Sequence, residues 1–360
     1  MSLVCPWNCS VCCVDAVHVT KKKSKILLES EGLSNTDYIG DSGNSIYDQA
    51  QKFMQIHKSE CTYEGKLKVL NNLRGINFHI EFSGGDPLVS SENLKVIEQA
   101  SRIFGRENIE VVSTGAGLGL VNPEYLAKYV HMIKFTYDSA EADMTETVRP
   151  AYYNSSNLSK IKKFKETNMK VRALIPITGE NTQESAIRKI YENLRRAEVD
   201  EIKLMRLFPV GRGMNTKAEM PSKDDYLRAI NLFQRIENEY DSGPKVGLQC
   251  ALKGLTDTSG ENPCDLYSGS LGIMHDGTLL TSAWAMGPTG KPLNDAFVLG
   301  NLIETPVTEL LESSKGKEYS KRLNENFGHC KIFSYLNSKK ENSLDRIFDA
   351  TDPLYKIAIN

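Results

Sequence analysis

Half of the eight cysteines of this 360-residue chain lie in one short stretch near its start. The stretch reads VCPWNCSVCCVDAV and contains Cys5, Cys9, Cys12 and Cys13. Cys5, Cys9 and Cys12 have the spacing C-x3-C-x2-C, and three thiolates so close in sequence can surround one metal centre. Soft thiolate ligands select zinc or an iron–sulfur cluster. The spacing therefore predicts a metal centre at this loop.

Composition favours metal binding over disulfide formation. A chain of this length buries roughly 75% of its unfolded surface and needs no disulfides for stability. Its 44 basic and 46 acidic side chains give a net charge of −2, which shows no bulk attraction to nucleic acid or anionic membrane. No apolar run approaches the roughly 20 residues of a membrane helix, and the start has no signal-peptide pattern. We therefore expect a cytoplasmic protein, without nucleic-acid or membrane partners, whose clustered cysteines bind metal or act in catalysis.

The number of clustered cysteines distinguishes the two metal centres. A closed zinc site takes four ligands, commonly as two C-x2-C pairs. Cys9 and Cys12 form one such pair and the chain has no second, so Cys13 or His18 would have to complete a zinc site. A four-iron cluster on three cysteines keeps one iron open, as a reactive centre requires. We favour the cluster, and keep a non-catalytic module with structural zinc as the alternative.

The elements that must position this loop alternate between strands and helices. Apolar or β-branched runs predict strands, and patterns with an apolar residue every three or four positions predict helices between them. The predicted strands are 78–83, 109–113, 132–137, 170–177 and 201–208. This alternation favours parallel βαβ units, and hence an α/β barrel or doubly wound domain.

Other segments interrupt this rhythm. We interpret residues 21–75 as an elaborated first strand–helix connection, with a loop at 32–45 followed by two helices. Because only four residues precede Cys5, we expect either that the first strand is very short or that the start of the chain has been trimmed.

The C-x3-C-x2-C loop resembles the signature loop of the radical S-adenosylmethionine (SAM) enzymes. The resemblance implies a partial (β/α)6 TIM-type barrel with a [4Fe-4S] cluster and S-adenosyl-L-methionine as cofactors. In that family the reduced cluster cleaves SAM to a 5′-deoxyadenosyl radical, which abstracts hydrogen from the substrate. One departure is Val11, where the family commonly has an aromatic residue before the third cysteine.

Further motifs follow in the family's order. FSGGDP (82–87) resembles Gly-Gly-Glu-Pro, with Asp86 in place of Glu, and STGAG resembles a Thr-Asn-Gly strand end. FTYDS resembles the Ser-x-Asp on the ribose side, TVRP holds an arginine that pairs with the cofactor carboxylate, and PVGRG resembles a turn near the adenine. The resemblance thus implies that SAM contacts Ser83, Gly84, Gly85, Asp86, Ser113, Thr136, Asp138, Arg149 and Pro209.

The C-terminal part resembles the auxiliary-cluster extensions called SPASM or twitch domains. We expect the barrel at 1–215, a linking helix at 216–245 and this extension at 246–360, with a hairpin turn at Asp276-Gly277. Ser282 stands where a cysteine ligand is expected. Cys250, Cys264 and Cys330 are scattered in the sequence, so we favour a degenerate domain with buried thiols over an auxiliary cluster. Such a domain would serve as a lid or substrate wall.

The resemblance implies a radical SAM oxidoreductase or modifying enzyme. The first expectation is oxidation or crosslinking of a peptide or protein, and the alternative is dehydrogenation or epimerisation of a small natural product. The family chemistry also implies an electron donor such as flavodoxin or ferredoxin. The sequence assigns no individual catalytic residue beyond the cofactor contacts.

Overall fold

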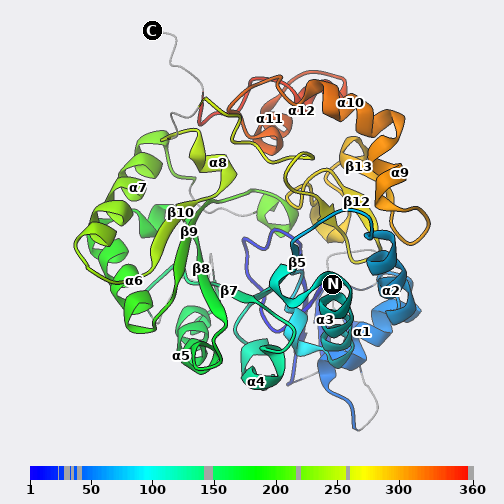
Figure 1. Ribbon diagram of the computed structural model, residues 1–360, viewed down its shortest axis with the longest axis horizontal. Coiled ribbons are helices and arrows are strands. Elements are labelled where there is room, and N and C mark those ends of the chain that lie inside the picture. Colours follow the sequence, from blue (N-terminus) through cyan, green and yellow to red (C-terminus); the bar gives the residue numbers. More distant parts are fainter. Residues whose placement is uncertain are drawn as a thin grey trace.

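A parallel sheet forms the centre of the computed structural model, which describes residues 1–22, 24–27, 33, 36–38, 43–141, 149–215, 220–256 and 260–355. The strands are β5 (Ile80–Phe82), β6 (Ile109–Ser113), β7 (Met132–Thr136), β8 (Lys170–Ile177), β9 (Glu201–Arg206) and β10 (Lys245–Leu248). Their order is β10-β9-β8-β7-β6-β5, and every neighbouring pair is parallel. Figure 1 shows the sheet curving like part of a barrel. The five strands predicted from the sequence are confirmed.

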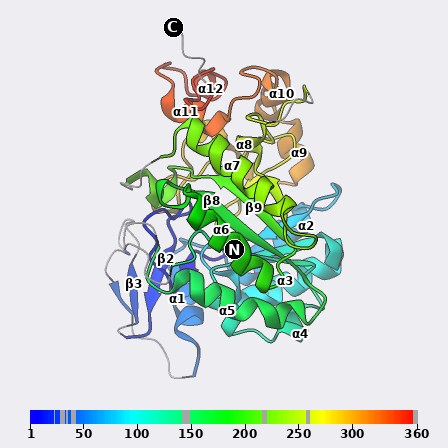
Figure 2. The same cartoon turned by 90° about the vertical axis from the view of Figure 1, so that its left-hand side faces the viewer.

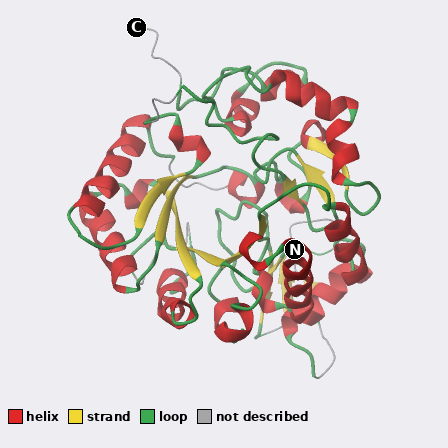
Figure 3. Cartoon of the chain, in the orientation of Figure 1, coloured by secondary structure: helices red, strands yellow, loops and turns green. Residues whose placement is uncertain are grey.

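Helices cover the outer face of this sheet (Figure 3). They are α3 (Ser91–Phe104), α4 (Pro123–Leu126), α5 (Tyr153–Lys165), α6 (Glu184–Arg196) and α7 (Lys223–Asn238). Alternate strand residues such as Ile133 and Phe135 are fully buried in the core against the helices. The chain therefore has the α/β fold expected from its alternating pattern, a partial TIM-type barrel.

The first connection contains a small sheet that the sequence did not predict. It consists of β1 (Val4–Cys5), β2 (Val17–Thr20), β3 (Lys25–Leu27) and β4 (Thr36–Asp37), in that order. Figure 2 shows β2 and β3 beside α1 (Ile46–Ile56), which α2 (Tyr63–Asn72) follows. Strands of two to four residues show too little alternation to be recognised. The loop expected at 32–45 lies largely outside the described residues.

Two glycines join the short first strand to the barrel. Gly85 N donates to Ser2 O at 3.0 Å, and Asp86 N donates to Val4 O at 2.9 Å. A Cβ atom at Gly85 would lie 2.1 Å from Val4 O, and one at Gly84 would lie 2.6 Å from Ser2 O. Only glycine allows this approach. The Gly-Gly pair therefore serves the contact between β1 and the loop after β5.

The C-terminal region forms a separate antiparallel sheet surrounded by short helices (Figure 1, top). Its elements are α8 (Cys250–Lys253), β11 (Gly272–Ile273), β12 (Thr278–Leu280), β13 (Val298–Asn301), α9 (Val307–Glu312), α10 (Ser314–Arg322), α11 (Lys331–Asn337) and α12 (Ser343–Ile347). The predicted hairpin at Asp276-Gly277 is present, and Gly277 has the positive φ of +87° that its turn requires. Because β10 pairs with β9, the barrel sheet extends beyond residue 245.

Short 3-10 helices lie at Pro87–Val89, Arg106–Asn108, Gly117–Gly119, Gly179–Asn181, Gly211–Asn215, Pro288–Gly290 and Asp295–Phe297. Within the described ranges, no helix combines the length and apolar character needed to cross a membrane.

Candidate active site at the barrel edge

The carboxyl ends of the parallel strands bring the predicted site residues to one edge of the sheet. Cys5 ends β1, Ser113 ends β6 and Thr136 ends β7. The loop that holds Asp86 follows β5, and Pro209 follows β9. Barrels of parallel strands carry their reactive groups at this edge, because the connecting loops there converge on the barrel axis.

The cysteine loop holds three free thiols close together. Cys5 and Cys9 are only 4% and 7% exposed, and neither they nor Cys12 forms a disulfide. Burial, together with the neighbouring Cys9, raises the pKa of the Cys5 thiol. Cys12 Sγ accepts a hydrogen bond from Ala16 N at 3.3 Å. The charges of Cys9 and Cys12 both add to the rise in the pKa of the Cys5 thiol, so the three possible thiolate ligands lie near one another.

Arg149 connects the cysteine loop to the end of β7. Its Nε donates to Asp138 Oδ2 at 3.0 Å, and its guanidinium also makes a hydrogen bond to Cys9. Burial lowers the pKa of Arg149, but the charge of Asp138 and further contacts raise it well above its ordinary value. Burial raises the pKa of the Cys9 thiol, while the charge of Arg149 opposes that shift. A permanent cation therefore stands beside a potential thiolate.

Asp138 retains an acceptor atom for a ligand. Its backbone is fixed because Asp138 N donates to Asn154 Oδ1 at 3.1 Å and Asn181 Nδ2 donates to Asp138 O at 3.0 Å. Its Oδ1 atom is buried and has no hydrogen-bond partner within the described part of the chain. A buried acceptor without a donor is costly, so a ligand hydroxyl at this point would be stabilising.

Asp86 is fully occupied by protein donors. Its carboxylate accepts from Leu88 N at 3.1 Å, from Thr114 Oγ1 at 2.7 Å and from Gly117 N at 2.9 Å. Ser113 Oγ and Thr114 N also donate to it, at 3.1 and 3.2 Å. The side chain therefore joins the loops after β5 and β6, although the family resemblance assigned it to the cofactor.

Several residues at this edge were not singled out from the sequence. Trp7 Nε1 donates to Thr114 O at 3.2 Å, and the Trp7 ring meets Tyr153 edge-on at 5.5 Å between centroids. Arg212 and Asp15 contact the cysteine loop as well. Arg212 lies in the PVGRG turn that the sequence identified, whereas nothing in the sequence pointed to Asp15.

The three thiols of the cysteine loop do not form a site for a single metal ion in the described part of the chain. No three His, Cys, Asp or Glu side chains among the described residues are placed to hold one metal ion, and this includes Cys5, Cys9 and Cys12. In a four-iron cluster each cysteine binds a different iron, so the thiolates need not converge on one point. Three free thiols, with Arg149 beside Cys9, have the chemistry that such a cluster requires.

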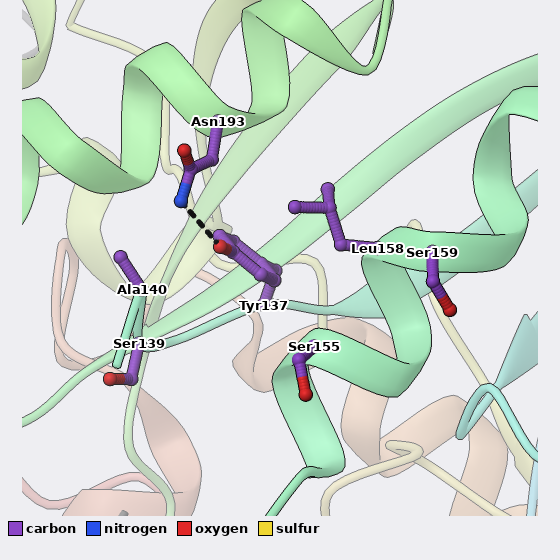
Figure 4. Close-up of a pocket in the computed structure, with 7 residues that line it drawn as sticks. All are labelled: Tyr137, Ser139, Ala140, Ser155, Leu158, Ser159 and Asn193. Carbon is purple, nitrogen blue, oxygen red and sulfur yellow. Dashed lines mark hydrogen bonds between the residues drawn. The ribbon is translucent and has the colours of Figure 1, made fainter. Parts of the chain in front are cut away.

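A large cavity borders the site on the side of β5. Its volume is about 640 Å³, within the range of ligand pockets. Its lining includes Val14 of the cysteine loop, Ser83 and Gly84 after β5, and residues 267–275 of the C-terminal region. A smaller pocket of about 290 Å³ lies outside the barrel, between α5 and α6 (Figure 4). In it Asn193 Nδ2 donates to Tyr137 OH at 3.0 Å. Only the larger cavity adjoins the cysteine loop.

The helices pack on one face of the strands. The other face, which lines the barrel interior, carries charged side chains. Lys134 on β7 forms ion pairs with Glu81 at 2.5 Å and with Glu110. Burial and the charges of Lys134 and Arg172 lower the pKa of Lys203 on β9. The barrel interior is therefore polar and carries charges of both signs, which suits a substrate with polar groups.

The three C-terminal cysteines lie near one another. Burial and the adjacent Cys264 raise the pKa of the Cys330 thiol to about 12. Burial also raises the pKa of the Cys250 thiol, and the charges of Cys330 and Cys264 add to that shift. All three are free thiols. Trp284 stacks on Phe208 at 4.3 Å between ring centroids, and so belongs to the packed core beside them. That these thiols hold no auxiliary cluster stays a prediction.

Comparison with known proteins identifies the fold. No family model and no curated protein matches the sequence. Among solved structures, SuiB from Streptococcus suis bound to its precursor peptide SuiA has a TM-score of 0.62 at 12% identity, over 94% of this chain and 72% of that one. The enzyme anSMEcpe with bound AdoMet has a TM-score of 0.56 at 16% identity, over 89% and 78%. Both are radical SAM enzymes. The chain has the radical SAM fold.

A further structure of anSMEcpe, with AdoMet and the Kp18Cys peptide, matches 96% of this chain and 93% of that one, with a TM-score of 0.57 at 13% identity. The match therefore spans the C-terminal region as well as the barrel. At such low identities the likeness concerns the fold, and it confirms the α/β partial barrel that the sequence predicted.

Proposed function

We propose that the chain is a radical SAM enzyme that modifies a peptide. The observation that carries this proposal is the set of three free thiols, two of them buried, in the spacing C-x3-C-x2-C, at the carboxyl edge of a barrel with the radical SAM fold. When bound, the [4Fe-4S] cluster and SAM would supply a 5′-deoxyadenosyl radical that removes a hydrogen atom from the substrate.

Each polar side chain at the barrel edge has a distinct role in this proposal. Cys5, Cys9 and Cys12 hold the cluster as thiolates. Arg149 offsets negative charge at Cys9 and presents a cation to the carboxylate of SAM. Asp138 Oδ1 accepts a hydrogen bond from a ribose hydroxyl, which satisfies its buried lone pairs. Asp86 fixes the loops on which the neighbouring backbone groups stand.

A peptide substrate is favoured by the shape of the molecule and by the comparisons. The cavity of about 640 Å³ connects the cysteine loop with the C-terminal region, which supplies one of its walls. SuiB and anSMEcpe were both solved with a bound peptide. We infer that the modification is an oxidation or crosslink, with electrons supplied by a protein of the flavodoxin or ferredoxin type.

Anaerobic reconstitution with iron and sulfide tests the metal centre. The wild-type chain should take up about four irons and show the absorption of an iron–sulfur cluster. Cys5→Ala, Cys9→Ala and Cys12→Ala should each lose the cluster, whereas Cys13→Ala and Cys61→Ala should keep it. Uptake of a single zinc ion that depends on Cys13 would support a structural metal site and overturn the proposal.

A further inference from the structure

Arg212 packs directly against the cysteine loop. It lies in the turn after β9, and its guanidinium contacts both ends of the segment 9–16. One terminal nitrogen donates to Cys9 O at 3.2 Å, and the other donates to Ala16 O. Its Nε forms an ion pair with Asp15 Oδ1 at 2.8 Å. A single side chain thus spans the segment that carries two of the three proposed cluster ligands.

Asp15 is held in an unusual conformation by these contacts. It has a positive φ of 48°, which non-glycine residues rarely adopt, and it is only 2% exposed. Its second oxygen accepts a hydrogen bond from Thr289 N of the C-terminal region at 2.6 Å. A strained residue persists only when its surroundings determine it, and such residues gather at functional sites. Here Arg212 and Thr289 are those surroundings.

The turn that carries Arg212 is itself packed on the loop. Gly213 N donates to Cys12 O at 3.4 Å, and Gly211 N donates to Met286 O at 2.9 Å. Gly211 has a φ of +57°, and a Cβ atom there would lie 2.4 Å from Cys13 O. The PVGRG turn therefore lies between the cysteine loop and the C-terminal region, in contact with both.

This packing also affects the hydrogen bonding of the Cys12 thiol. Ala16 N donates to Cys12 Sγ at 3.3 Å, and the position of Ala16 is set by the bond from Arg212 to its carbonyl. Hydrogen bonds to cluster sulfurs stabilise the reduced state and thereby raise the reduction potential. A group that orients Ala16 therefore acts on the cluster without touching it.

We propose that Arg212 and Asp15 form a clamp that positions the cysteine loop for cluster binding and couples the C-terminal region to the cluster. Arg212 is a positioning residue, since it acts through Ala16 and Cys9. The clamp rests on the proposed function for its effect on the cluster. Its effect on the loop is a property of the apoprotein.

Hydrogen–deuterium exchange of the apoprotein tests the clamp without any cluster. Arg212→Gln should raise the exchange rate of amides in residues 9–16 about tenfold or more. In the wild type, local opening of the loop must break the Arg212 contacts, and without them the free energy of opening is lower. Arg212→Lys keeps the charge but not the three-way geometry, so it should restore only part of the protection. The matched control is Arg188→Gln, since Arg188 forms an exposed ion pair with Glu239 and should leave the loop unchanged. Unaltered exchange at 9–16 in Arg212→Gln would overturn the clamp.

Redox titration of the reconstituted protein then tests the link to the cluster. Arg212→Gln should shift the midpoint potential to a more negative value and change the electron paramagnetic resonance signal of the reduced cluster, while Arg188→Gln should match the wild type. A potential that does not move would overturn the coupling. If the wild type binds no cluster, the proposed function fails, whereas the exchange result still decides whether the clamp exists.

Discussion

Asp86 shows how a residue in a ligand-binding motif can serve the protein itself. Its carboxylate receives bonds from backbone and hydroxyl groups on the two loops after β5 and β6. It is completely buried, and hydrogen bonds to a charged acceptor are worth more than neutral ones. The motif is therefore explained in part by loop architecture.

Replacement of Asp86 measures this role. Asp86→Asn places an amide nitrogen against donors such as Thr114 and Gly117, so the free energy of unfolding of the apoprotein should fall by about 2–3 kcal/mol. Urea denaturation measures the change. Asp224→Asn, on the exposed first turn of α7, is the control and should change stability by less than about 0.5 kcal/mol. Equal free energies of unfolding for the two variants would contradict this structural role of Asp86.

At this scale the sequence identified the residues of the motifs but not their protein partners. The family motifs assigned Cys5, Asp86 and Asp138 to one site, and in the structure Cys5 ends β1, Asp86 follows β5 and Asp138 follows β7. Arg212 and Ala16 are 196 positions apart in the sequence, and no local sequence pattern predicts a contact over that separation. The positive φ of Asp15 could not be predicted either, because nothing in the sequence VDAV requires a turn there.

Elements were predicted well where their periodicity was long, and poorly where a helix start had no capping side chain. The apolar spacing in NLSKIKKFKE predicts a helix from Asn157, whereas α5 begins at Tyr153 in the structure. It follows Tyr152, which has a φ of 62° and offers no side-chain cap, so its start has no sequence signal. By contrast, α3 begins directly after Ser90, which caps it by accepting from Asn93 N.

The hairpin between β11 and β12 carries a buried histidine whose titration should affect stability. His275 O accepts bonds from both the amide and the thiol of Cys61, which joins the hairpin to the segment before α2. Burial lowers the pKa of His275 below its ordinary value, and Nδ1 has no hydrogen-bond partner among the described residues. The folded state therefore binds a proton at this imidazole less readily than the unfolded chain, which binds one below about pH 6.5.

The free energy of unfolding should consequently fall on acidification, because the unfolded state takes up a proton at His275 more readily. Its contribution is present above about pH 6.5 and is lost below that value, by up to ~1.4 kcal/mol per pH unit. Thermal unfolding at pH 7.5 and pH 5.5 measures the loss, which should be smaller in His275→Gln than in the wild type. His57→Gln, at an exposed position after α1, should retain the wild-type difference. An identical acid sensitivity of all three proteins would contradict the assignment.

At the scale of the whole molecule, a buried ion pair joins the barrel to the C-terminal region. Arg206 at the end of β9 donates two hydrogen bonds of 2.8 Å to the carboxylate of Asp352. Their side chains are only 4% and 0% exposed, and Phe333 lies against the guanidinium. Removing one partner of such a pair leaves an uncompensated buried charge.

The pair predicts a large loss of stability on truncation. Arg206→Met should lower the free energy of unfolding by about 3–5 kcal/mol, because Asp352 remains buried without its cation. Arg188→Met breaks the exposed pair with Glu239 and should cost far less stability than Arg206→Met, because solvent screens an exposed pair. Denaturant titration of both variants checks the difference. If the two losses were similar, the C-terminal region would not depend on this contact.

The most direct test of the radical SAM proposal is the formation of 5′-deoxyadenosine from SAM by the anaerobically reconstituted, chemically reduced protein. The account predicts that the wild type forms 5′-deoxyadenosine and that Cys9→Ala, treated in the same way, forms none. A wild-type protein that contains the four-iron cluster, is incubated with peptide substrates and still leaves SAM intact would contradict it.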